Sequence, residues 1–161
     1  MASDTLQAIR GLLDANHIDY RLIHHEPTYT SEQSARVRGE PIRIGGKAIL
    51  MKTDDSFRLF VLSAGLRVSS KTVKKQLGVA NLRFANSDEL LDLTGLVPGS
   101  VPPFGKPILP FELYADPSVF ENDRIAFNAG SLTDSIVMSS ADYRQIANPR
   151  VFPFALRSDQ S

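Results

Sequence analysis

One lysine stands where a strand is expected to begin beside a potential cleft. Lys47 follows two glycines and precedes the apolar run Ala-Ile-Leu-Met at residues 48–51. A lysine at the mouth of a buried strand can extend its ammonium group into solvent while its methylene chain covers apolar surface. It can also present the ammonium group to a carbonyl or phosphate oxygen inside a cleft. The residue type alone favours the solvent-exposed arrangement.

A glycine- and proline-rich segment, residues 95–105, is the second candidate. Its sequence is GLVPGSVPPFG, with three glycines, three prolines and no charged side chain. Because proline lacks an amide donor and glycine loosens the backbone, the segment cannot form a helix interior or a central strand. It is either a rigid connector over the core or one wall of a ligand pocket. As a wall, it would let a ligand approach backbone amides closely and would lose little entropy on binding.

The usual side-chain arrangements for metal, nucleophilic and nucleotide chemistry are missing from the sequence. His24 and His25 are adjacent on an expected strand, so they point to opposite faces and cannot chelate one metal ion together. The chain has no cysteine, which excludes disulfides, thiolate zinc sites and a cysteine nucleophile. Neither a G-x-S-x-G nucleophile elbow nor a G-x-x-x-x-G-K-[ST] phosphate loop occurs. We therefore expect no metal site and no cofactor.

Periodicity and capping side chains predict five short helices that would position these residues. In the first, Leu6, Ile9, Leu12 and Leu13 share one face. Thr30 and Gln33 have the spacing of a capping box at the start of the second. The expected helices and their N-caps are 4–15 (Asp4), 30–39 (Thr30), 69–78 (Ser69 or Ser70), 88–95 (Ser87, without a capping box) and 140–148 (Ser140).

Strands are expected between these helices, and their arrangement indicates the fold class. The clearest signal is residues 47–64, where two β-rich runs flank a polar TDDS turn and predict a hairpin of two central strands. Irregular alternation of helices with strands joined by short turns favours an α+β fold with a mixed, mostly antiparallel sheet flanked by helices. The other expected strands are 20–24, 82–85, 108–116 (with Pro110 at an edge), 124–130 and 135–139.

Length and composition indicate one domain. The chain has 161 residues, of which 42% are hydrophobic and 22% charged, as in ordinary globular proteins. We expect a single domain over residues 1–161, with its core at about 20–149 and a dispensable tail, RSDQS. The N-terminal residues contain no apolar run long enough for a signal peptide or a membrane span, so we expect a cytoplasmic protein that binds no membrane.

Three segments occur in the same order as in a known family. They are HHEPTYTSEQSA at 24–35, GGKAILMK at 45–52 and the loop at 95–105. A fourth, RIAFNAGSLTDSIVMSSADY at 124–143, is similar to the closing strand pair and helix of that family. The chain thus resembles the YbaK/ProX family of aminoacyl-tRNA deacylases, which includes the editing domain associated with prolyl-tRNA synthetases. The resemblance implies hydrolysis, in trans, of the ester that joins a wrong amino acid to tRNA.

The resemblance also implies roles for particular residues. Lys47 corresponds to the lysine that faces the pocket near the terminal adenosine of the tRNA. Gly95, Pro98 and Gly99 correspond to the G-x-x-P-G loop whose backbone shapes the site around the aminoacyl group. Tyr29 is a candidate for lining the pocket, and core packing explains an aromatic residue there equally well. The same two explanations apply to Phe104.

One position departs from the alanine-specific branch of the family. Those relatives commonly carry a histidine-proline step on the late strand, whereas this chain has Asn128 and Ala129, followed by Gly130 and Ser131. This step fits other branches, and the Asn128 amide can exchange hydrogen bonds inside a pocket. We expect Asn128, Gly130 and Ser131 to bind substrate, with alanine, cysteine, serine and threonine all open as the amino acid removed.

The implied mechanism requires little from side chains. An aminoacyl ester is already activated, and in this family a hydroxyl of the substrate is thought to help activate or orient water. Backbone amides of residues 95–105 would stabilise the developing oxyanion, and Lys47 would fix the substrate. The expected partner is mischarged aminoacyl-tRNA, with an aminoacyl-tRNA synthetase as a further candidate. The alternative is a non-catalytic module of the same fold that binds tRNA or a synthetase.

Six basic residues are candidates for contacts with tRNA phosphates. Lys71, Lys74 and Lys75 occur at i, i+3 and i+4 of an expected helix, so they share one face. A solvated helix face is the alternative explanation. The 18 Lys and Arg residues are balanced by 18 Asp and Glu residues, and no helix-turn-helix or zinc-finger pattern occurs, so we expect no DNA binding. The full set is Arg36, Arg38, Arg43, Lys71, Lys74 and Lys75.

Overall fold

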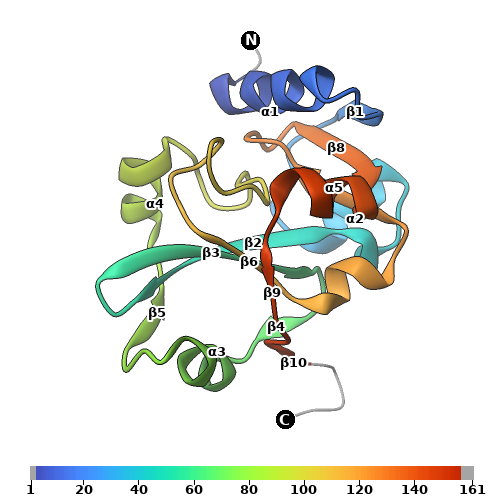
Figure 1. Ribbon diagram of the computed structural model, residues 1–161. Coiled ribbons are helices and arrows are strands. Elements are labelled where there is room, and N and C mark those ends of the chain that lie inside the picture. Colours follow the sequence, from blue (N-terminus) through green and yellow to red (C-terminus); the bar gives the residue numbers. More distant parts are fainter. Residues whose placement is uncertain (1–2, 157–161) are drawn as a thin grey trace.

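A central hairpin organises the chain, which a computed structural model describes over residues 3–156 (Figure 1). Strands β2 (Gly46–Thr53) and β3 (Ser56–Ser63) pair antiparallel around the polar turn, which confirms the predicted hairpin. Successive side chains of β3 enter two different cores, with Leu59 and Val61 on one face and Phe60 and Leu62 on the other. Burial on both faces explains why this strand is a continuous apolar run.

The hairpin belongs to a five-stranded mixed sheet. Strand β5 (Leu82–Phe84) pairs antiparallel with β2, whereas β6 (Leu113–Ala115) and β9 (Arg150–Val151) extend the other side in parallel. The predicted strand 108–116 is wrong over residues 108–112, of which 108–111 form a turn and bends, and the strand ends at Ala115. Pro110 lies in this part, and without an amide hydrogen it cannot donate to a neighbouring strand.

A three-stranded antiparallel sheet packs beside the first. Strand β8 (Asp134–Ser139) lies between β1 (Tyr20–His24) and β7 (Arg124–Asn128), so the predicted 124–130 strand ends at Asn128. An isolated parallel bridge joins Gly45 to Ala126. A third, two-stranded sheet pairs β4 (Arg67–Val68) with β10 (Ala155–Leu156), which the sequence did not indicate.

All five predicted helices are present. The second and third, α2 (Ser31–Arg38) and α3 (Ser70–Leu77), are capped by Thr30 and Ser69 as predicted. The capping box at α2 is incomplete, because the Gln33 side chain accepts from the Tyr29 amide instead of the Thr30 amide. Two short 3-10 helices were not predicted, at Ile42–Ile44 and Pro117–Glu121.

The predicted caps of the other three helices are wrong by one residue. Helix α1 (Asp4–Ala15) is capped by Ser3, α4 (Ser87–Thr94) by Asn86, and α5 (Ser140–Ala147) by Ser139. In each case the residue before the predicted cap has extended backbone, from which its side-chain oxygen reaches an amide of the first turn. Asn86 and Glu89 form the full capping box that Ser87 could not.

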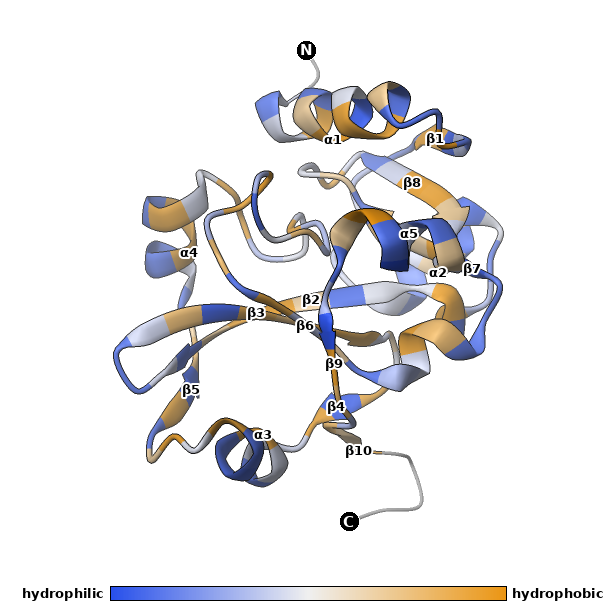
Figure 2. Cartoon of the chain, viewed as in Figure 1, coloured by the Kyte–Doolittle hydropathy of each residue, from blue (hydrophilic) through white to orange (hydrophobic). Residues whose placement is uncertain are grey.

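Two hydrophobic cores lie on the two faces of the five-stranded sheet. The larger contains the inner face of α1, the middle of β8 and Phe104, and the smaller contains Val73 of α3 and Phe154. Figure 2 shows hydrophobic residues along the central strands and hydrophilic residues at the tip of the β2–β3 hairpin. The predicted α+β class with a mixed, mostly antiparallel arrangement is confirmed, although the strands divide into three sheets. None of the helices within residues 3–156 is long and apolar enough to cross a membrane.

Candidate functional site

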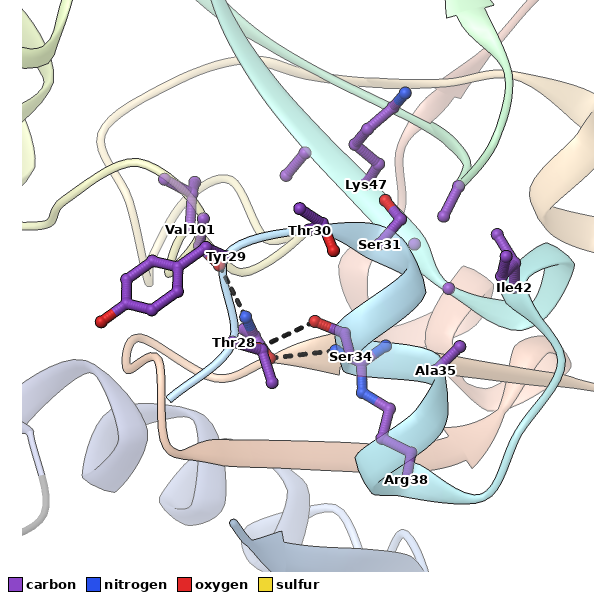
Figure 3. Close-up of a pocket in the computed structure, with 16 residues that line it drawn as sticks. Thr28, Tyr29, Thr30, Ser31, Ser34, Ala35, Arg38, Ile42, Lys47 and Val101 are labelled. Atoms are coloured by element: carbon purple, nitrogen blue, oxygen red, sulfur yellow. Dashed lines mark hydrogen bonds between the residues drawn. The ribbon is translucent and has the colours of Figure 1, made fainter. Parts of the chain in front are cut away.

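A polar cavity of about 250 Å³ opens between α2, the start of β2 and the 95–105 loop. Lys47 and Gly99 both line it, so the two candidates identified first in the sequence meet at one site. Figure 3 shows Lys47 on β2, Arg38 on α2, and Tyr29 pointing away from the other lining side chains. The other polar lining residues are Thr28, Thr30, Ser31, Ser34 and Asn128.

The glycines before Lys47 allow three segments to approach closely at the base of the cavity. A Cβ atom on Gly46 would lie 2.6 Å from Cδ1 of Ile125, and one on Gly45 would lie 2.9 Å from Cβ of Ala64. Larger residues would force β2 away from β7 and from the end of β3. The two glycines therefore determine the position of Lys47 relative to β7 and to the end of β3.

Helix α2 supplies a wall of small and polar side chains with no large apolar residue. Its inward face carries Ser34, Ala35 and Arg38, all of which line the cavity. The Ser34 hydroxyl donates to Oγ1 of Thr28, 2.9 Å away, and so ties the helix to the segment that precedes it. Four of these lining residues were not predicted as site residues: Thr28, Thr30, Ser31 and Ser34. The predicted helix has no apolar stripe, and small polar residues occupy the positions that face the protein. This pattern in the sequence could have identified them.

Lys47 is half-buried, and its ammonium group is held by a backbone carbonyl. The Nζ atom donates to the carbonyl oxygen of Leu66. Burial lowers the pKa of this lysine, and the nearby Glu32 carboxylate partly opposes the shift. An ammonium group has three hydrogens, so one hydrogen bond to Leu66 leaves two for a ligand.

Part of the 95–105 loop forms another wall of the cavity. Gly99, at φ +88°, and Val101 line the cavity. Within residues 3–156 the Gly99 amide has no protein acceptor, although the neighbouring Ser100 amide donates to the Val97 carbonyl at 3.1 Å. Gly95 is the left-handed C-cap of α4, and it lies outside the cavity lining together with the exposed Pro98.

Phe104 lies in the core and does not line the cavity. It is 1% exposed, and its ring contacts those of Phe127 and Tyr143, each with centroids 5.5 Å away. The Tyr143 hydroxyl donates to the Pro103 carbonyl at 2.6 Å. Pro103 and Phe104 thus hold the end of the 95–105 loop in the core. The preceding residues of the loop, which include Gly99, are therefore attached to a fixed segment.

Asn128 connects the 95–105 loop to α2. Its Oδ1 atom accepts from Nη2 of Arg38 at 3.0 Å and from the Ser135 hydroxyl at 3.1 Å. Its Nδ2 atom donates to the Gly99 carbonyl at 2.7 Å. Arg38 also donates through Nε to Ser135 at 2.9 Å. Burial lowers the pKa of Arg38 to about 10, so its guanidinium keeps its charge at neutral pH.

Gly130 and Ser131 lie next to the cavity without lining it. The Gly130 amide donates to the Ser100 carbonyl at 2.9 Å, which joins the 130–133 turn to the loop. Gly130 has φ +79°, and a Cβ atom there would lie 2.6 Å from Cβ of Thr5. Ser131 exchanges a hydrogen bond with Thr133.

The six basic candidates do not form one surface at the cavity. Of these, Arg38 alone lines it. Arg36 is exposed on α2, and Arg43 donates to the side chain of Asn122. Helix α3, with Lys71, Lys74 and Lys75, covers the opposite face of the five-stranded sheet (Figure 1).

The cavity can hold and orient a polar ligand, and it offers hydrogen-bond donors of several kinds. None of the described residues that line it carries a carboxylate or an imidazole. No three His, Asp or Glu side chains between Ser3 and Leu156 come together as a potential metal site. The side-chain donors in the lining include the Lys47 ammonium group and the Arg38 guanidinium.

Comparison with known proteins assigns the family. The model of the aminoacyl-tRNA editing domain matches residues 25–146. The chain is 34% identical over 158 residues to the multifunctional Ser/Thr-tRNA deacylase ProXp-y of Escherichia coli K12, covering 94% of this chain and 93% of that protein. It is 27% identical to the prolyl-tRNA editing protein ProX of Acetoanaerobium sticklandii, over 94% and 97% of the two chains.

The fold is also similar to that of a solved structure. A crystal structure of a proposed trans-editing enzyme for prolyl-tRNA synthetase superposes with a TM-score of 0.83 at 19% identity, over 98% of this chain and 100% of that one. At this identity the match shows the common fold alone. The family model covers the α2 wall, Lys47, the 95–105 loop and Asn128. The chain therefore belongs to the aminoacyl-tRNA editing domain family.

Proposed function

We propose that this protein is an aminoacyl-tRNA deacylase that acts in trans on mischarged tRNA, and that its cavity accepts seryl and threonyl groups. The observation that carries the proposal is that Lys47 and Gly99, which are far apart in the sequence, both line one small cavity. Membership of the editing family supports the reaction class. The 34% identity with a Ser/Thr-tRNA deacylase supports the choice of amino acids.

The polarity of the cavity agrees with a hydroxyl-bearing acyl group. Thr28, Ser34 and Asn128 place oxygen and nitrogen atoms around a volume of about 250 Å³. A site that hydrogen-bonds a substrate hydroxyl rejects an analogue without it far more strongly than an apolar pocket rejects one methylene, which is worth only about 1–3 kcal/mol. We expect seryl and threonyl esters to be cleaved in preference to alanyl esters of the same tRNA.

The proposed chemistry is addition of water to the ester carbonyl. The water oxygen bonds to the carbonyl carbon, and negative charge develops on the carbonyl oxygen. The Gly99 amide, which has no protein acceptor among the described residues, and the two remaining hydrogens of the Lys47 ammonium group are the donors available to that oxygen. The ester bond to the ribose then breaks, the ribose oxygen takes up the proton that the attacking water gives up, and a free amino acid leaves.

The rim of the cavity offers a surface for the 3′ end of the tRNA. Tyr29 lines the cavity, yet its side chain points outward and the residue is 70% exposed. An exposed aromatic ring is a platform on which a nucleobase stacks, with about 1–3 kcal/mol per base. We place the terminal adenine there. Charged tRNA is used in the cytoplasm, where we expect this protein to act, with a synthetase as a candidate partner.

A panel of charged tRNAs tests this function. Seryl-, threonyl- and alanyl-tRNA are incubated with the wild type, with Lys47→Ala, and with Lys52→Ala as a matched control from the same strand outside the cavity lining. We expect faster loss of serine and threonine with the wild type and the control, and loss of that activity in Lys47→Ala. Tight binding of tRNA without hydrolysis of any ester would favour the alternative, a non-catalytic binding module.

A further inference from the structure

Arg38 makes contacts that do not suit a phosphate-binding residue. Its guanidinium is partly buried at the cavity, where Nε donates to Ser135 at 2.9 Å and Nη2 donates to Asn128 at 3.0 Å. These two residues stand directly opposite each other on the paired strands β7 and β8. The planar fork of an arginine can bind both members of such a pair at once, whereas a lysine offers a single ammonium group.

The arginine fixes the orientation of the Asn128 amide. Oδ1 faces two donors, Arg38 and Ser135, so the amide oxygen must lie on that side. Nδ2 then points to the Gly99 carbonyl, 2.7 Å away. A rotation of the amide by 180° would place its NH2 group against the guanidinium and its oxygen against the carbonyl, which is repulsive at both ends.

The side-chain amide of Asn128 restrains Gly99, whose backbone would otherwise be free to rotate. Gly99 has no side chain to limit its backbone, and its φ of +88° lies in a region that glycine enters and leaves freely. The peptide group between Gly99 and Ser100 is held at both ends, since its carbonyl accepts from Asn128 and its N–H donates to Val97. Fixing this peptide group limits the directions in which the adjacent Gly99 amide can point.

We propose that Arg38 is a positioning residue, which holds Asn128 so that Asn128 holds the Gly99 wall of the cavity in its reactive geometry. The role rests on the proposed function, because the Gly99 amide matters for turnover only if the cavity hydrolyses an ester. It replaces the expectation that Arg38 contacts tRNA phosphates. Its loss should lower kcat and leave KM nearly unchanged, whereas loss of a phosphate contact would raise KM.

Two substitutions distinguish the contribution of Arg38 from that of the Asn128 amide. Arg38→Lys keeps the charge and removes the fork. Asn128→Asp keeps an oxygen for Arg38 and Ser135, but it places a carboxylate oxygen against the Gly99 carbonyl, so the wall is released while Arg38 stays paired. Arg150→Met, at an exposed site on β9 that does not line the cavity, is the matched control.

Steady-state deacylation of seryl-tRNA is the first measurement. A displacement of a catalytic group by 1 Å costs about 100-fold in rate, so we expect both variants to lose between about 10- and 100-fold in kcat, with KM within about twofold of the wild type. The control should match the wild type. A rise in KM at unchanged kcat in Arg38→Lys would overturn the proposal in favour of a tRNA contact. Unchanged kcat and KM in a variant that only melts earlier would overturn it in favour of a purely structural role.

A second measurement needs no tRNA and therefore separates the two proposals. Amide signals of Gly99 and Ser100 in 15N-correlated NMR spectra should shift and broaden in Arg38→Lys and in Asn128→Asp, and not in Arg150→Met. If these signals respond although the wild type cleaves no ester, the positioning of the wall stands and the proposed function fails. If the wild type cleaves esters while neither the signals nor kcat change, the positioning role fails. Should Arg38→Lys not fold, Asn128→Asp decides the outcome.

Discussion

Replacing Gly99 by valine perturbs the cavity wall at a single defined point. Gly99 has φ +88°, which a β-branched residue adopts only under strain, and an added Cβ atom would lie 3.3 Å from Cδ2 of Leu132. The Leu132 contact is with the end of a flexible side chain and can relax. The backbone strain is relieved only if the Gly99 peptide rotates, and that rotation turns the amide away from its present direction and weakens the bond from Asn128.

The magnitudes follow from the strain and from the size of the chain. A residue forced into such a backbone region costs about 1–3 kcal/mol. With an unfolding entropy of about 2.1 cal/mol/K per residue, a chain of 161 residues has about 0.34 kcal/mol/K in total. The expected fall in melting temperature is therefore about 3–9 °C. A displacement of the amide by 1 Å would lower turnover by about 100-fold.

The assay compares Gly99→Val with Gly78→Val. Gly78 ends α3 with a φ of +67° and open space around it, so valine there has a similar backbone strain far from the cavity. Both variants should melt earlier by similar amounts, while kcat for seryl-tRNA falls only in Gly99→Val and tRNA affinity changes little in either. Equal loss of affinity and turnover in Gly99→Val, or an unchanged kcat, would refute the role of the loop as a wall of the reactive site.

Three other predictions concern charge, stacking and pH. Lys47→Met should abolish deacylation without lowering the melting temperature at pH 7. Burial lowers the Lys47 pKa, so the ammonium group disfavours the folded state at low pH, and thermal melts should show the wild type gaining stability over the variant as the pH rises toward 10.5. Tyr29→Ala should raise KM by about 5- to 150-fold at unchanged kcat and melting temperature, since stacking is worth about 1–3 kcal/mol; an unchanged KM would remove Tyr29 from the tRNA surface. Hydrogen bonds from Arg83 hold the Glu89 pKa at about 2, below its ordinary 4.5, so urea titrations should find Glu89→Gln less stable than the wild type above pH 4.5 and the gap closing as pH falls to about 2; a gap that persists at pH 2 would contradict this origin.

Most local elements could be predicted because their signals are contained within a few residues. The β2–β3 hairpin follows from two β-rich runs around a polar turn. The caps of α4 and α5 were misplaced because Asn86 and Ser87, and likewise Ser139 and Ser140, are pairs of residues that can both cap. Backbone conformation, which the residue types do not reveal, selects the first of each pair.

The pairing of strands that are far apart in the chain could not be predicted from the sequence. Strand β6 has only three residues, and its parallel partners β3 and β9 come from distant parts of the chain. No turn or periodic pattern in the sequence indicates such contacts, because parallel strands need a long connection. The apolar residues on both sides of Pro110 therefore suggested a longer strand than the one that forms.

The candidate site was predictable in part. Lys47 and the 95–105 loop could be identified, and the cavity brings Lys47 and Gly99 together. Arg38 was assigned to a basic surface because a sequence does not reveal which side of a short helix is covered. The i, i+4 spacing of Ser34 and Arg38 places them on one face of α2. Only the packing of Asn128 and Ser135 against that face turns the arginine inward.

The most direct test is a structure of the protein with a seryl-adenosine analogue in which an amide replaces the hydrolysable ester. We expect the seryl group to enter the cavity, with its carbonyl oxygen about 3 Å from the Gly99 amide and facing the Lys47 ammonium group, and with the adenine against Tyr29. An analogue bound elsewhere on the protein, or bound with its carbonyl turned away from both Gly99 and Lys47, would show that this cavity is not the reactive site.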